Sequence, residues 1–150
     1  MYGSIFSREL QKIAFNYTTP IVAGLTTAAL HGIAPEVFDR DVSVGQRVQM
    51  MALGGALGGI NGMNARALGE PAVAMIVPAT TAAAILGKGI GRVAGVSDTT
   101  SNIMAGAAAG GTLGSFAGRF IGGKKPLPIA AGALVGAGLF GGLGAIAPNG

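Results

Sequence analysis

The sequence has no cysteine, no tryptophan, a single histidine and only a small charged fraction, 11%. Without cysteine there is no disulfide, no cysteine-ligated zinc site and no thiol nucleophile. The six acidic residues stand at the ends of apolar segments, so no carboxylate pair falls on one helix face. General acid–base and nucleophilic catalysis need such sets. We therefore predict a protein that is not an enzyme, with no cofactor, no metal site and no small-molecule substrate.

The charge that is present is weakly basic. Ten lysines and arginines against six acidic residues give a formal net charge of +4. These cations are spread along the chain and few aromatic residues lie among them, which is a poor pattern for nucleic acid. Basic loops beside anionic phospholipid headgroups explain the same charge better. The sequence thus predicts an anionic phospholipid partner and no nucleic-acid partner.

Glycine and short apolar residues are what the chain has in abundance: 28 glycines and a hydrophobic fraction of 50%, with a mean hydropathy of +0.58. Disordered chains are polar and charged, so this composition argues against disorder. The apolar share is mostly alanine and glycine, which fill little volume in a soluble core. In lipid, by contrast, small residues let helices approach closely.

The clearest pattern is a repeat of glycine at every fourth position, which places the glycines in one slanted groove along a helix. We predict that these glycines mediate helix packing. The predicted packing residues are Gly54, Gly58, Gly62, Gly106, Gly110, Gly114, Gly118, Gly132 and Gly136.

Uncharged segments predict four membrane spans. Their expected limits are about 46–65, 71–90, 101–119 and 127–147. Pro78 removes a backbone donor in the second span and predicts a kink, with Thr80 or Thr81 satisfying the freed carbonyls. The predicted fold is an all-α membrane protein, with four glycine-zipper transmembrane helices in residues 46–150.

Residues 1–45 are predicted to form a separate amphipathic, interfacial segment. Phe6, Leu10, Ile13 and Tyr17 follow a helical spacing. This pattern fits an interfacial helix, an import signal or an ordinary surface helix, and the sequence leaves these alternatives open.

The apolar stretch 18–34 is short for a span, and the sequence leaves open whether it crosses the membrane. His31 within it is interpreted as a packing residue. Residues 35–45 are expected to be a polar connection, in which Asp41 or Ser43 caps the next helix.

Two further connections carry the remaining charges. Arg119, Lys124 and Lys125 lie in a predicted basic turn at 119–126, where they are candidates for binding lipid headgroups. The positive-inside rule then places this turn on the matrix or cytoplasmic side. Lys88 and Arg92 are expected in a loop at 88–98.

The residues from Asp98 onward carry a more specific pattern. Asp98 is followed after six residues by Ala105 and Gly106, and after three more by Gly110. This spacing resembles the second half of the motif of the mitochondrial inner-membrane translocase family, the preprotein and amino-acid transporter group. The resemblance covers about residues 44–147 and implies four transmembrane helices. Arg92 stands further from the aspartate than the family's arginine does.

The stretch AGAAAGGTLGSFAGR is also similar to the third helix of one branch of that family, the translocase-like accessory subunit of respiratory complex I. This resemblance implies a structural, multi-pass subunit of the inner mitochondrial membrane that contacts other membrane subunits and cardiolipin. Two alternatives stay open. One is a component of an inner-membrane protein-import translocase, and the other is a glycine-zipper phage virion or pore-forming protein.

Overall fold

The computed structural model describes residues 2–38 and 40–147, with side chains described at 7–11, 18–38 and 40–147. All regular secondary structure within those residues is helical, which confirms the all-α prediction. The helices are α1 (Tyr2–Val37), α2 (Val44–Leu68), α3 (Pro71–Ala74), α4 (Ile76–Val93), α5 (Asp98–Gly122) and α6 (Pro126–Ile146).

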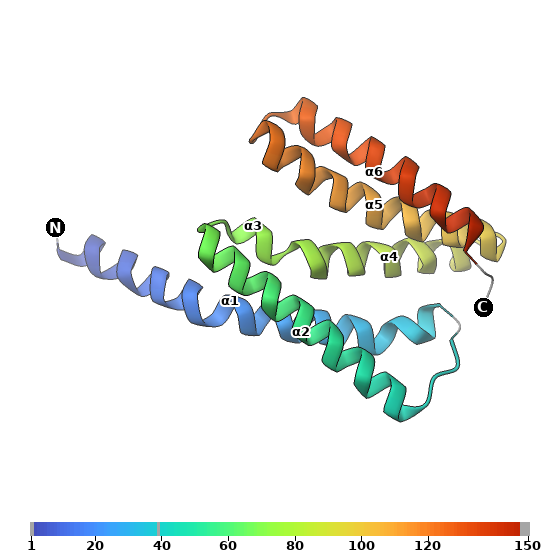
Figure 1. Ribbon diagram of the computed structural model, residues 1–150, viewed down its shortest axis with the longest axis horizontal. Coiled ribbons are helices and arrows are strands. Elements are labelled where there is room, and N and C mark those ends of the chain that lie inside the picture. The colour runs from blue at the N-terminus through green and yellow to red at the C-terminus, as the bar shows by residue number, and fades with distance from the viewer. Residues whose placement is uncertain (1, 39, 148–150) are drawn as a thin grey trace.

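Successive long helices run in opposite directions and stack in a row (Figure 1). α1 packs along α2, α4 packs on α1 and α5, and α6 packs chiefly on α5. The first part of α1 extends beyond the other helices at one end of the stack. Because the connections are short, each helix pairs mainly with the helix before or after it in the sequence.

α1 is one continuous helix of 36 residues that includes both Pro20 and Pro35. The expectation that Pro35 opens a polar connection is wrong, because Pro35 is fully buried within the helix. The connection is shorter and ends at Ser43, which caps α2. Ser43 Oγ accepts a hydrogen bond from Gln46 N, and Ser43 N donates one to Gln46 Oε1. The predicted cap is thus confirmed. The apolar series in residues 1–17 falls largely on side chains outside the described residues.

The kink predicted from Pro78 is confirmed. The chain breaks its helix between α3 and α4 at Met75, three residues before Pro78. A proline cannot donate to the carbonyl four residues earlier, which is that of Ala74. The prediction that a threonine satisfies the freed carbonyl is wrong for Thr80, whose buried hydroxyl has no hydrogen-bond partner.

The loop expected at 88–98 is much shorter. Lys88 and Arg92 lie within α4, and the turn consists of residues 94–97, with Gly95 in the left-handed region at φ 68°. Similarly, Arg119 lies in the last turn of α5, so the basic turn proper is Gly123–Lys125. Gly123 supplies the positive φ of 67° that this turn requires.

The interior of the stack is made of small residues, and its surface carries the large apolar ones. The buried apolar side chains are mainly alanines, whereas Leu25, Ile121 and Leu134 are 68%, 88% and 75% exposed. The accessible surface is 9080 Å². A compact soluble protein of 14.6 kDa exposes about 6,900 Å². The stack therefore leaves an unusually large, apolar surface uncovered.

Among the described residues, one helix is long and apolar enough by itself to cross a membrane, namely α6. Glycine, threonine, serine and asparagine lower the mean hydropathy of α2, α4 and α5. By length, the 25 residues of α2 and of α5 extend about 37 Å. This exceeds a hydrocarbon core of about 30 Å.

Candidate functional site: the glycine seams and the charged ends

The seam between α5 and α6 joins glycine to backbone in a regular antiparallel register. A Cβ added at Gly106, Gly110, Gly114 or Gly118 would fall within 3.0 Å of the carbonyl oxygen of Phe140, Gly136, Gly132 or Pro128, respectively. Each step of four along α5 is matched by a step of four back along α6. The contact is reciprocal, because Gly132 and Gly136 meet the carbonyls of Gly114 and Gly110. All six predicted packing glycines of these two helices thus lie where the backbones touch.

The seam between α1 and α2 is different in kind. A Cβ at Gly54 would meet the ring of His31 at 2.6 Å, and a Cβ at Gly58 would meet Thr27 Cβ at 2.8 Å. Gly62 lies against Pro20, whose Cα an added Cβ would approach to 2.5 Å. Here Gly54 and Gly58 form notches that receive side chains of α1, although Gly58 also faces the carbonyl of Ala23 and Gly62 faces backbone atoms. His31 Nδ1 also donates a hydrogen bond to Thr27 O at 2.9 Å, so His31 is a packing residue in this structure.

A third seam, between α4 and α5, contains glycines outside the predicted set. Gly87 would place a Cβ 2.9 Å from Ala105 Cα, and Gly91 would place one 2.6 Å from Ser101 Cβ. Ala105 and Ser101 are both buried in this contact. The spacing of Gly87, Gly91 and Gly95 was a usable signal for this seam, but the expected loop obscured it.

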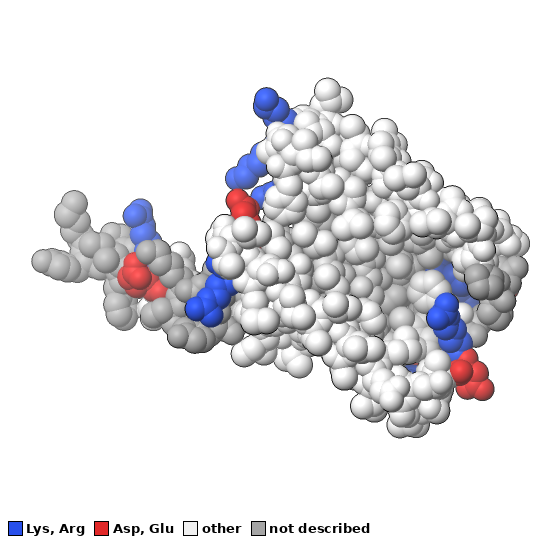
Figure 2. Space-filling view, viewed as in Figure 1, with Lys and Arg blue, Asp and Glu red and all other residues white. Residues whose placement is uncertain are grey.

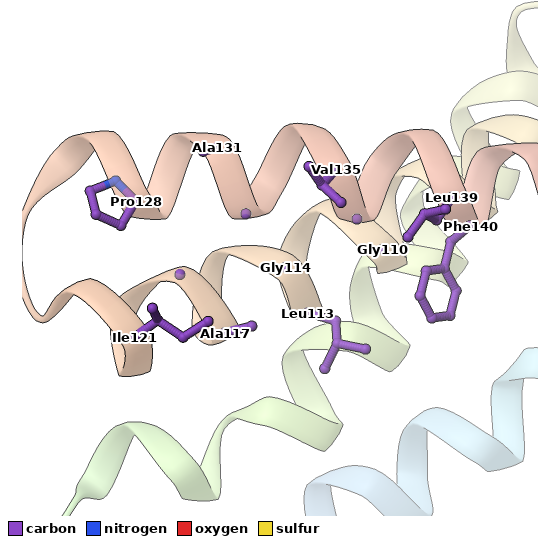
Figure 3. Close-up of a pocket in the computed structure, with 13 residues that line it drawn as sticks. Gly110, Leu113, Gly114, Ala117, Ile121, Pro128, Ala131, Val135, Leu139 and Phe140 are labelled. Carbon is purple, nitrogen blue, oxygen red and sulfur yellow. The ribbon is translucent and has the colours of Figure 1, made fainter.

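An apolar groove of about 520 Å³ runs along one side of the α5–α6 pair (Figure 3). Its lining includes Gly110 and Gly114 along α5, and the side chains of Leu113, Val135 and Leu139 stand along it (Figure 3). The lining contains no charged residue among those described. The groove is thus suited to apolar chains and offers no group for chemistry.

Charged side chains gather at the two ends of the visible face and leave its broad middle uncharged (Figure 2). One end holds Arg66 in the last turn of α2, Arg119 in that of α5, and the turn with Lys124 and Lys125. The two lysines are exposed. The predicted headgroup-binding residues therefore share one end of the stack, near the start of the α5–α6 groove.

The opposite end holds the residues of the resemblance motif. Arg92 donates hydrogen bonds of 3.0 Å to the carbonyls of Glu36 and Val37, and so joins α4 to the end of α1. Asp98 is in the first turn of α5, where its negative charge interacts favourably with the helix dipole. Ala105 faces α4 about two turns later, opposite Gly87 of that seam.

Among the polar residues, Lys88 differs most from its predicted position. It was expected in a solvated loop, yet its side chain is 5% exposed and bonds Asn102 Oδ1 at 2.7 Å. Its ammonium also lies 3.6 Å from Asp98 Oδ1. The available signal was its helical spacing to Gly87 and Gly91, which places it beside the α4–α5 seam.

Within 2–38 and 40–147, no three residues of the metal-ligating types cluster closely enough to hold a metal ion. Comparison of the chain with protein-family models, with curated proteins and with solved structures finds no match to any of them.

Proposed function

We propose that this chain is a non-catalytic, multi-pass membrane subunit that braces a larger assembly through glycine-mediated helix packing. The four longer spans correspond to α2, to α3 with α4, to α5 and to α6. The apolar part of α1 lies against α2, so we include it as a fifth membrane-embedded helix. The assembly we propose is respiratory complex I of the inner mitochondrial membrane.

One observation carries the membrane part of this proposal: small residues lie inside and large apolar residues outside. In water this distribution would be unfavourable, because burial of leucines and isoleucines drives folding there and these side chains would stay exposed. In lipid the hydrocarbon solvates those side chains, and helices associate through close packing of small residues instead. The uncharged middle and charged ends of the visible face fit the same setting (Figure 2).

The choice of assembly rests on the sequence resemblance at Asp98, Ala105, Gly106 and Gly110. The proposed role is structural because the seams use backbone contacts and the groove is apolar. Lipid-facing leucines of α6 and the open side of the stack supply surface for neighbouring membrane subunits.

We further propose that Arg119, Lys124 and Lys125 contact anionic lipid headgroups, with cardiolipin as the phospholipid that the resemblance implies. Each basic residue near an anionic surface contributes about 1 kcal/mol. The positive-inside rule orients their end of the stack toward the matrix or cytoplasm. The end of α6 then lies on the other side.

The first experiment identifies the proteins that co-purify with the full chain after extraction in mild detergent. Respiratory subunits would support the complex I assignment. Import subunits would favour the translocase alternative, and virion proteins would favour the phage alternative. Either of the last two results overturns the assignment.

A matched pair of variants tests the packing role. Gly110→Leu places a large side chain against the Gly136 carbonyl, whereas Gly138→Leu lies on a face with no heavy atom within 4 Å of the added Cβ. We expect Gly110→Leu to release the subunit from its complex on native gels and Gly138→Leu to retain it. Normal assembly of Gly110→Leu would contradict the proposal.

A further inference from the structure

A cavity of about 280 Å³ with a partly polar lining lies at the end of the stack where α1 terminates. Its wall takes residues from α4, α5, the end of α6 and the connection after α1. Lys88, Arg40 and Asn102 are its polar lining residues, and the others are alanines, glycines and Phe38. None of the described lining residues is acidic. The cavity therefore brings two cationic side chains to one small space.

Lys88 is incompletely paired for a buried ammonium group. Of its three donors, one reaches the neutral Asn102 Oδ1 at 2.7 Å. The Asp98 carboxylate lies 3.6 Å away and is 63% exposed, so solvent screens this pair. A buried charge is costly unless it is well paired and hydrogen-bonded. An anion in the adjacent cavity would meet this need.

We propose that this cavity binds a phosphate-type oxyanion through Lys88 and Arg40. Arginine offers a planar fork of donors and lysine a compact point charge, and both suit phosphate oxygens. The pairing of a buried lysine with an exposed arginine leaves one side of the anion open to the surface.

The size and walls of the cavity limit what it can hold. Drug-sized ligands occupy pockets of roughly 300–1,000 Å³, so 280 Å³ suits a small anion or a single headgroup. Ala84, Gly106 and Gly144 in the wall keep this space open, since none carries a side chain beyond Cβ. A larger residue at Ala84 would occupy the site without changing its charge.

Two sources supply the same chemistry: free phosphate and the phosphate of an anionic phospholipid headgroup. The cavity is at an end of the stack rather than in its uncharged middle, so either source can reach it. The inference depends on Lys88 and Arg40 alone and is independent of the proposed assembly.

The test uses the full chain in neutral detergent with two probes. Inorganic phosphate is titrated by calorimetry, and phosphatidic acid is compared with phosphatidylcholine by native mass spectrometry. We expect saturable binding of phosphate, phosphatidic acid or both, and no retention of phosphatidylcholine. Binding of phosphate assigns a free-anion site, and binding of phosphatidic acid alone assigns a headgroup site. Binding of neither anionic probe overturns the inference.

Variants then locate the binding. Lys88→Met and Arg40→Gln should each weaken it roughly 10- to 100-fold, the range expected for loss of one charge-assisted bond. Lys88→Arg should retain it, and Ala84→Leu should abolish it with the charges intact. Arg47→Gln is the matched control, because Arg47 is at the same end but bonds Glu36 outside the cavity.

Circular dichroism melts of each variant separate loss of binding from loss of fold. If Lys88→Met does not fold, Arg40→Gln and Ala84→Leu still decide the question. Affinities equal to that of the unmodified chain in both of these variants would overturn the inference.

Discussion

The two helix hairpins at opposite sides of the stack use glycine in different ways. Between α5 and α6 glycines of both helices meet backbone carbonyls, and beside Gly110 the Cβ of Phe140 also comes close. Between α1 and α2 the glycines of α2 receive the side chains of His31 and Thr27. The same spacing of four residues therefore builds a seam of mainly backbone contacts in one hairpin, the backbone seam. In the other hairpin it builds a seam that also receives side chains, the notch seam.

This difference predicts different tolerance to substitution. In the backbone seam an added atom meets groups that cannot move unless the whole hairpin opens. In the notch seam the obstacle is partly a side chain, which can be removed by a second substitution. The side chains of His31 and Thr27 also help to set the register of the notch seam, whereas contacts between glycines and carbonyls set most of the backbone seam.

The largest effect is expected from Gly114→Leu in the backbone seam. The new side chain would meet the carbonyl of Gly132. We expect a cost of about 3 kcal/mol, the upper end of the usual range for overpacking. The free energy of unfolding in mixed micelles measures the effect. Gly142→Leu, on the open face of α6, should change it by less than about 0.5 kcal/mol. Similar losses in both variants would disprove the seam.

The second prediction separates the seams by rescue. Gly54→Ala should lower the unfolding free energy by about 1–3 kcal/mol, and His31→Ala in the same chain should restore much of it, because the ring is the obstacle. Gly110→Ala should not be rescued by Phe140→Ala, since both the Gly136 carbonyl and the Cβ at position 140 remain. A double-mutant cycle measures both couplings. Equal rescue in both hairpins would erase the distinction between them.

A smaller effect is expected from two threonine hydroxyl groups that bond carbonyls of their own helices. Thr27 is fully buried and donates to Ala23 O at 2.8 Å, so Thr27→Val should cost about 0.5–1.5 kcal/mol. Thr112 makes the same bond to Ala108 O on α5 but is only partly buried. Thr112→Val should therefore cost less. Thermal unfolding of the two variants in one detergent compares their stabilities. A larger loss of stability for Thr112→Val would contradict the prediction that the more deeply buried hydroxyl contributes more.

The smallest effect has the opposite sign. Gly138 has no atom near an added Cβ, so Gly138→Ala removes a helix-destabilising glycine without a clash. We expect a gain of up to about 1 kcal/mol. The same substitution at Gly136, which faces Gly110 O, should destabilise instead. If the melting temperature changes in the same direction for both variants, the predicted difference between the open face and the seam face of α6 is wrong.

Much of the fold was predictable because its signals are local. The helical class, the Ser43 cap, the break before Pro78 and the glycine repeats all follow from residues close together in the sequence. Boundaries were less predictable near charges. Lys88 and Arg92 suggested a loop, but their partners Asn102 and the α1 carbonyls lie far along the chain and hold them in a helix.

The sequence by itself determined that helices would form and which of their faces would carry glycine, because helix geometry converts a spacing of four into one groove. Only the tertiary structure decided what enters each groove. A glycine notch accepts a carbonyl, a threonine or a histidine with equal ease, so its occupant depends on the register of the partner helix. The tertiary structure also decided the place of Lys88, because burial of a charge depends on residues that surround it in space.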